Sequence, residues 1–187
     1  MSVAPYQILS GPAYPYVAPV GTAFPTVGVT PSGAWVSLGL TEGGVSVHHT
    51  STINQIASDQ RTGPVKALRS AEGLNIDFTL QEVTLENYAR ALNSATVTSA
   101  AGPPATKTIN FHRGFDVAQF ALLIVGNSPY GPWNMQYQVP VVYQAAEPNP
   151  VFASANNANL ATSWVALEDL TAASDSLRFG QLVAQSA

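Results

Sequence analysis

Hydrophobic and polar residues follow two different periods within residues 73–93 of the chain. Four large apolar residues spaced two apart, with polar residues between them, predict a strand with one buried face, namely Leu74, Ile76, Phe78 and Leu80. The apolar residues that follow fall at i, i+3, i+4 and i+7 and predict one stripe of a short helix, namely Leu85, Tyr88, Ala89 and Leu92. Thr84 is suited to cap this helix and Asn93 to end it. Because so short a helix is marginal in water, we expect its stripe to pack on a sheet.

The same alternation predicts shorter strands on either side of this pair. Residues 35–40 and 45–49 predict a hairpin around 41–44, since the two glycines there can take the positive φ of a tight turn. Two weaker strands flank a second turn, the strands being 53–59 and 65–68 and the turn 61–64. Beyond the helix we expect strands at 107–112, 135–143, 164–170 and 177–184, with breaker-rich loops at 94–106 and 144–162.

Residues 117–125 form an almost wholly apolar run that fits both a helix and a strand. The dense turn signal that follows, Gly126 to Pro132, favours a strand. The elements are then mostly strands with one helix. The expected fold is therefore mainly β, a β-sandwich or partly open barrel with one short flanking α-helix and an extended N-terminal arm.

The arm is the prediction for residues 1–33, which hold six of the fourteen prolines. Proline fixes φ and removes a hydrogen-bond donor, so these residues predict an extended segment outside the single domain of residues 34–187. The aromatic side chains of Tyr14, Tyr16 and Phe24 need a partner, and we expect them to contact a neighbouring subunit. A disordered leader is the alternative.

Composition narrows the classes of function. The chain has 187 residues, is 46% hydrophobic and 10% charged, and contains no cysteine, which excludes disulfides and thiolate metal sites. Its seven cationic side chains are scattered and its net charge is −4, which argues against tight binding of nucleic acid. No apolar run reaches the roughly 18 residues of a membrane span, and the first twenty residues do not resemble a secretory signal. So little charge predicts a surface largely covered by copies of the same chain.

Candidate chemistry is sparse. His48 and His49 are adjacent, so in a strand they point to opposite faces and cannot share one metal ion. Glu82 and Glu86 have the spacing of one helix face, but a solvated helix start explains them. No nucleophile, phosphate-binding or zinc-protease motif occurs. The sequence therefore predicts no catalytic residue, no metal and no cofactor, and a protein that is not an enzyme.

A series of short motifs, taken together, is more specific. They are residues 18–25 (APVGTAFP), 33–35 (GAW), 38–39 (LG), 41–45 (TEGGV), 59–60 (DQ), 63–65 (GPV) and 79–87 (TLQEVTLEN). Their order and spacing, from about residue 18 to residue 93, resemble the tail tube (major tail) proteins of long-tailed bacteriophages. The later segments 122–126, 128–129 and 135–143 look similar in a looser way.

The resemblance implies a virion structural protein without catalysis, assembled in the host cytoplasm. Six copies would form a ring, and stacked rings would form a tube with a continuous inner barrel through which DNA passes without specific binding. Its partners would be itself and other tail proteins at the tube ends. An acidic chain suits a channel wall that must not hold DNA, and Glu42 and Asp59 are the candidate lumen-facing residues. The alternative is a capsid decoration protein or another virion β-sandwich that binds a shell or a glycan.

Overall fold

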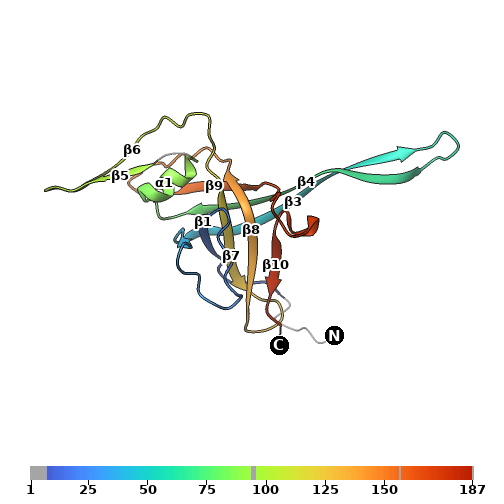
Figure 1. The fold of residues 1–187 in the computed structure, drawn as a ribbon, viewed down its shortest axis with the longest axis horizontal. Coiled ribbons are helices and arrows are strands. Elements are labelled where there is room, and N and C mark those ends of the chain that lie inside the picture. Colours follow the sequence, from blue (N-terminus) through green and yellow to red (C-terminus); the bar gives the residue numbers. More distant parts are fainter. Residues whose placement is uncertain (1–7, 94–95, 156, 187) are drawn as a thin grey trace.

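The computed structural model describes residues 8–93, 96–155 and 157–186, which form a mainly β fold with one short α-helix, as predicted (Figure 1). All strand pairings between these residues are antiparallel. In chain order the elements are β1 (Tyr14–Pro19), β2 (Val36–Ser37), β3 (Thr41–Ala57), β4 (Pro64–Leu80), α1 (Leu85–Ala91), β5 (Val97–Ala100), β6 (Thr106–Ile109), β7 (Phe120–Asn127), β8 (Asn134–Gln144), β9 (Leu160–Ala166), the 3-10 turn η2 (Asp175–Leu177) and β10 (Gln181–Ala184).

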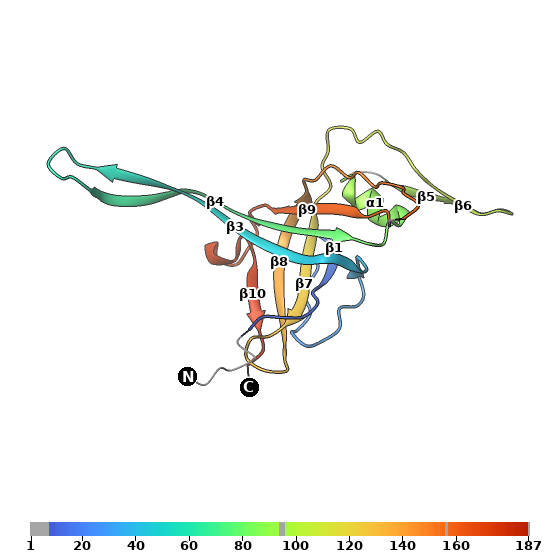
Figure 2. The ribbon, with the colours of Figure 1, turned by 180° about the vertical axis from the view of Figure 1, so that it is seen from behind.

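The main sheet has the strand order β2-β1-β7-β8-β9-β4-β3 and divides at β8. One edge of β8 pairs with β7, whereas the other edge pairs with β10 at residues 135–138 and with β9 at residues 142–144. β9 then continues into β4 and β3. Figures 1 and 2 show β3, β4 and β9 running across β7, β8 and β10, so one sheet folds into two packed layers.

The core lies between these two layers. The alternating residues of the predicted strand supply one side of it, and Leu74, Ile76, Phe78 and Leu80 are all buried, as expected. The other layer contributes the buried residues Val17, Leu122, Ile124, Val139 and Val142. Trp164 joins them, since its ring stacks on Phe78 with centroids 6.4 Å apart and meets Phe120 edge-on at 5.9 Å. The two-residue period of β4 is thus the direct cause of its place in the fold.

The helix is capped as predicted but turned differently from the expected stripe. The Thr84 hydroxyl accepts a hydrogen bond from the backbone N–H of Asn87 at 3.2 Å, and Asn93 ends the helix with φ of 64°. Ala89 and Leu92 are buried, and Tyr88 packs against the core.

Leu85 is the exception, because it is only half-buried and lies outside the core cluster. Asn87 and Ala91 face inward in its place. The side-chain amide of Asn87 donates hydrogen bonds to the carbonyls of Leu38 at 3.0 Å and Glu82 at 3.1 Å. These two hydrogen bonds turn the polar Asn87 inward, which a count of apolar residues cannot predict.

The interpretation of residues 1–33 as an extended arm outside the domain is wrong for Tyr14–Pro19. These residues form β1, which pairs with β7 at six positions. Val17 and Ala18 are buried in the subunit's own core. Proline is tolerated because β2 covers only two residues of β1 and leaves much of its outer edge unpaired. The predicted break between an arm and a domain at residue 33 therefore does not hold.

The predicted hairpin turn at residues 41–44 is a bulge within a continuous strand. The register of β3 against β4 shifts between Glu42 and Val45, and Gly43 and Gly44 have φ of 75° and 86°. Positive φ was correctly expected there, but it kinks the strand and does not reverse it. The chain reverses at the second predicted turn, between Ala57 and Pro64. Its two flanking strands are each 17 residues long, far longer than predicted.

Candidate assembly surfaces

The two longest strands of the described chain, β3 and β4, extend beyond the two packed layers. β3 and β4 pair as far as Ala57 and Pro64, and their outer half projects away from the two packed layers (Figures 1 and 2). Residues 48–57 and 59–72 are all exposed. We refer to residues 50–72 as the outer hairpin. A two-stranded hairpin alone is at best marginally stable in water, so this length without a covering layer is unusual.

The outer hairpin carries apolar side chains on both faces. Its large apolar residues are between 45% and 57% exposed, namely Ile53, Ile56, Val65 and Leu68. Ile56 pairs with Lys66. Leu68 lies two positions after Lys66 in β4 and pairs with Asn54. Side chains two positions apart lie on the same face of a strand pair. Ile56, Leu68 and Lys66 therefore share one face.

Backbone edges are also unpaired in the described part of the chain. β3 is the last strand of the sheet, so its outer edge has no partner along its length. β4 pairs with β9 only at residues 75–80, which leaves its second edge free through the outer hairpin. Unpaired edges present rows of N–H and C=O groups that favour pairing with another chain.

A hollow of about 600 Å³ lies between the base of this hairpin and the C-terminal strand β10. Its apolar lining is Leu74, Tyr137, Val139, Phe179 and Leu182. Its polar rim includes His49, Arg69, Glu72 and Asp175. β10 approaches β8 closely at its start, since a Cβ on Gly180 would lie 2.0 Å from the Gln138 carbonyl oxygen, and Gly180 has φ of 93°. Only glycine fits this position, and it places the floor of the hollow.

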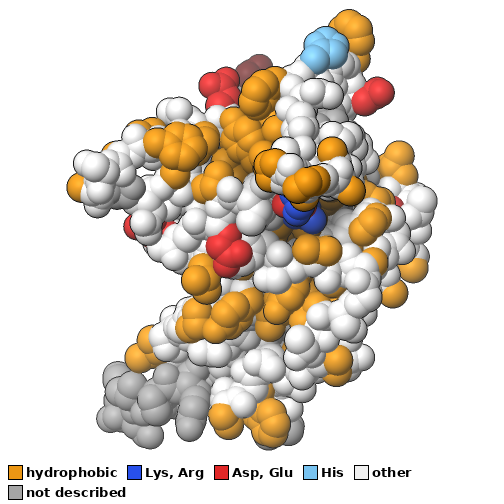
Figure 3. All heavy atoms as spheres, turned by 90° about the vertical axis from the view of Figure 1, so that its left-hand side faces the viewer, with side chains coloured by type: hydrophobic (Ala, Val, Ile, Leu, Met, Phe, Trp, Pro, Cys, Tyr) orange, Lys and Arg blue, Asp and Glu red, His pale blue; other side chains and the backbone are white. Residues whose placement is uncertain are grey.

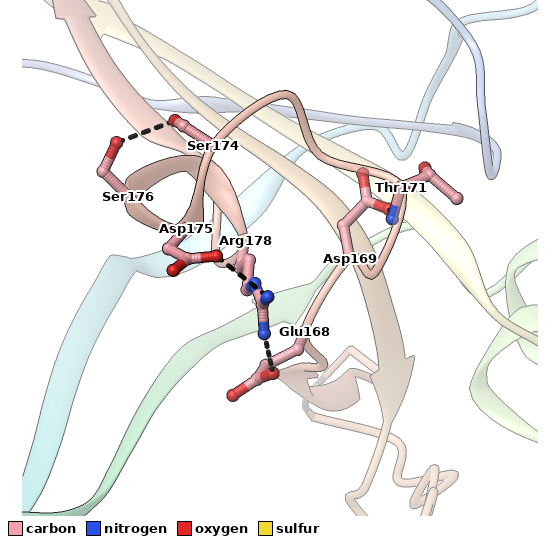
Figure 4. A network of polar contacts seen from close by, with 7 residues as sticks. All are labelled: Glu168, Asp169, Thr171, Ser174, Asp175, Ser176 and Arg178. Carbon is pink, nitrogen blue, oxygen red and sulfur yellow. Dashed lines mark hydrogen bonds and ion pairs between the residues drawn. The ribbon is translucent and has the colours of Figure 1, made fainter.

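One wall of the hollow belongs to the loop of residues 167–178, which polar contacts hold in shape (Figure 4). Arg178 bonds Glu168 at 3.2 Å and Asp175 at 2.8 Å. Asp169 accepts hydrogen bonds from the hydroxyl and the backbone N–H of Thr171, and these bonds hold its pKa below the ordinary value. The loop contains three carboxylates and one guanidinium, so it carries a net charge of −2.

The three predicted subunit contacts differ in exposure. Tyr14 is 49% exposed at the start of β1. Tyr16 and Phe24 instead pack within the subunit, where the ring centroids of Phe24 and Trp35 are 5.2 Å apart. These two side chains therefore have partners within the subunit, and their need for a partner does not require a neighbouring subunit.

The two predicted lumen-facing residues are not brought together. Glu42 lies at the bulge near the start of β3 and accepts a hydrogen bond from Asn159. Asp59 lies beyond the far end of the same strand, in the exposed turn of the hairpin. Sequence reasoning missed the outer hairpin itself as a candidate surface. Its signal was the two weak strands around the second turn.

The remaining surface offers little chemistry. Charged side chains are sparse on the face that carries β5 and β6, where apolar side chains emerge in several areas (Figure 3). Among the described residues, no cluster of three or more His, Cys, Asp or Glu is placed to hold a metal ion. No described helix is long and apolar enough to cross a membrane.

Comparisons with known proteins add no assignment. The chain matches no protein-family model, and no curated protein matches it in a sequence search.

Proposed function

We propose that this protein is a structural subunit that polymerises with copies of itself into the tail tube of a long-tailed bacteriophage, as stacked rings of six around a channel for DNA. The observation that carries the proposal is the outer hairpin. It exposes both faces and has free backbone edges, and these features are costly for a monomer but useful for a subunit whose neighbours cover them.

Charge supports the same function. A tube that conducts DNA must not hold it, and eleven acidic against seven basic residues give each subunit a net charge of −4. Contacts between different faces of identical subunits close into rings or continue into filaments, and a tube of stacked rings uses both outcomes. The number six comes from the family resemblance.

A capsid decoration or glycan-binding protein is the second candidate. It is favoured by exposed aromatic side chains outside the hairpin, of which Phe115 and Phe152 are the most exposed. These two come from different loops, after β6 and after β8 respectively. Neither loop explains a 17-residue strand pair that leaves the body. We therefore place the tube function first.

The test is to remove the outer hairpin without disturbing the body. Ser51 and Glu72 are register partners, so residues 52–71 can be replaced by Asn-Gly, which forms a two-residue hairpin turn. Because the core lies wholly outside this segment, the variant is expected to remain a folded monomer by circular dichroism and light scattering. The full chain is expected to form rings or tubes in negative-stain micrographs at high concentration. A full chain that stays monomeric, or a shortened chain that still forms tubes, would contradict the proposal.

A further inference from the structure

We infer that the hollow beside β10 receives the outer hairpin of a second copy of this chain, with Ile56 and Leu68 on its apolar floor and Lys66 beside Asp175 at its rim. The inference rests on the proposed function, because it names the contact through which one subunit holds the next. Three observations support it, from shape, from apolar surface and from charge.

The shape of the hollow fits a strand from another chain. β10 pairs with β8 on one side only, so its outer edge faces the hollow without a partner among the described residues. Across the hollow lies the base of the hairpin, where β4 has not yet met β9. A strand placed between them could pair with the free backbone edge of β10 on one side and that of β4 on the other.

The apolar surfaces also match. Leu182 is 51% exposed on β10, and the floor continues through Val139 and Phe179. Ile56 and Leu68 are 45% and 46% exposed on one face of the outer hairpin. Covering both surfaces with each other removes apolar area from water at two places with one contact. A volume of about 600 Å³ accommodates several side chains from one face of the hairpin.

The charges are of opposite sign. The outer hairpin has Arg61, Lys66 and Arg69 against Asp59 and Glu72, a net charge of +1 in a protein whose total is −4. The loop at residues 167–178 has a net charge of −2, and Asp175 is its charged residue that lines the hollow. Lys66 forms no ion pair with any described residue, and Asp175, although paired with Arg178, keeps a side chain that is 91% exposed. Opposite charges at the rim of an interface fix its orientation and exclude wrong partners.

The hairpin that enters the hollow belongs to a second copy. The base of the hairpin is itself a wall of the hollow, and backbone pairing between β3 and β4 carries the outer half away from it (Figure 1). The hairpin therefore cannot fill its own hollow. A hairpin placed in a hollow is a contact between different faces, so a joined pair keeps one free hollow and one free hairpin with which to extend the assembly.

A charge swap tests the contact. Lys66→Asp and Asp175→Lys, made singly, are each expected to raise the concentration at which half the protein assembles by about tenfold, because each leaves two like charges together. The double variant restores the pair and is expected to assemble near the concentration of the unmodified chain. Arg113→Glu is the control, since it also replaces an exposed cation but lies outside the hollow.

A cysteine pair gives a second readout, because the chain has no cysteine of its own. On mild oxidation Leu68→Cys/Leu182→Cys is expected to give a ladder of covalent oligomers on a non-reducing gel. The control Leu68→Cys/Val151→Cys, whose second position is 61% exposed against 51% for Leu182, is expected to give dimers at most.

Failure of this inference is distinguishable from failure of the proposed function. An unmodified chain that never assembles overturns both. An unmodified chain that assembles, while the charge swap changes nothing and the ladder is absent, overturns only the placement of the hairpin. That second result also covers the case in which another protein or a small molecule occupies the hollow.

Discussion

β4 passes through two environments, and the difference between them separates stability from assembly. At residues 75–80 it lies between β3 and β9, and its alternating side chains are buried in the core. At residues 64–72 it has β3 alone beside it, and every side chain is exposed. Both halves belong to one strand with a continuous direction. A strand pattern therefore tells where a strand runs but does not tell which surface covers it.

The two halves should also differ in energy. A buried side chain in the inner half contributes the free energy of removing its surface from water. The apolar side chains of the outer half gain little of that free energy in the monomer and gain it only when another surface covers them. Substitutions in the inner half should therefore change folding, and those in the outer half should change association.

The largest effect is expected from Phe78→Ala in the inner half. Phe78 is 4% exposed and stacks on Trp164, so its truncation leaves a cavity beside the largest ring of the core. Such a change costs about 3–5 kcal/mol of unfolding free energy, a large part of a typical total of 5–15 kcal/mol. Urea denaturation followed by tryptophan fluorescence measures it.

Leu68→Ala is the matched control in the outer half of the same strand. Leu68 is 46% exposed, so its truncation is expected to change the unfolding free energy of the protein by no more than about 0.5 kcal/mol. Equal losses from the two substitutions would mean that the outer hairpin has a partner within the monomer, and the comparison would fail.

The inner half of β4 and the helix cap could be predicted from the sequence because their signals are local. Alternation in Leu74 to Leu80 and the Thr84 cap depend on residues close together in the chain. The same method failed for Leu85, because the helix is turned by hydrogen bonds from Asn87 to carbonyls that include Leu38, 49 residues away. Information that lies in a distant partner is not present in a local pattern.

The N-terminal prediction failed for a related reason. Pro15 and Pro19 argue against a central strand, and the local rule is sound. The rule does not include the length of β2, which pairs with only Tyr16 and Val17 and so leaves Pro15 and Pro19 without a partner strand on that side. Likewise, the two glycines at 43 and 44 predicted positive φ correctly, whereas the choice between a turn and a bulge depended on the pairing of Val45 with Phe78. The outer hairpin was missed as a site because exposure depends on neighbours.

A smaller effect is expected for a polar residue of the body. Asn87→Ala removes the donors to the Leu38 and Glu82 carbonyls from a side chain that is 5% exposed. Leaving such groups without partners costs about 1–3 kcal/mol. Asn54→Ala, at an exposed position of β3, is the control and is expected to change stability by less than about 0.5 kcal/mol. Thermal melting of both variants at one pH compares them, and a stable Asn87→Ala protein would show that these bonds do not orient the helix.

The smallest effect is expected from an exposed ion pair of the body, where water limits the contribution as it does on the outer hairpin. The hydrogen bond from Lys107 to Glu86, 2.6 Å long, is the main cause that holds the pKa of Glu86 below its ordinary value, and the backbone N–H of Glu86 adds to it. A carboxylate whose pKa is lowered by folding stabilises the folded state at pH values above the ordinary glutamate pKa of about 4.3. This stabilisation is lost as the pH falls through the lowered pKa. The melting temperature of the unmodified chain is therefore expected to fall slightly more than that of Glu86→Gln between about pH 5.5 and pH 3. Salt at about 1 M shortens the screening length to about 3 Å and is expected to reduce the difference. A larger fall for Glu86→Gln would mean that the carboxylate is not stabilised in its charged form, and that α1 and β6 are held together by packing alone.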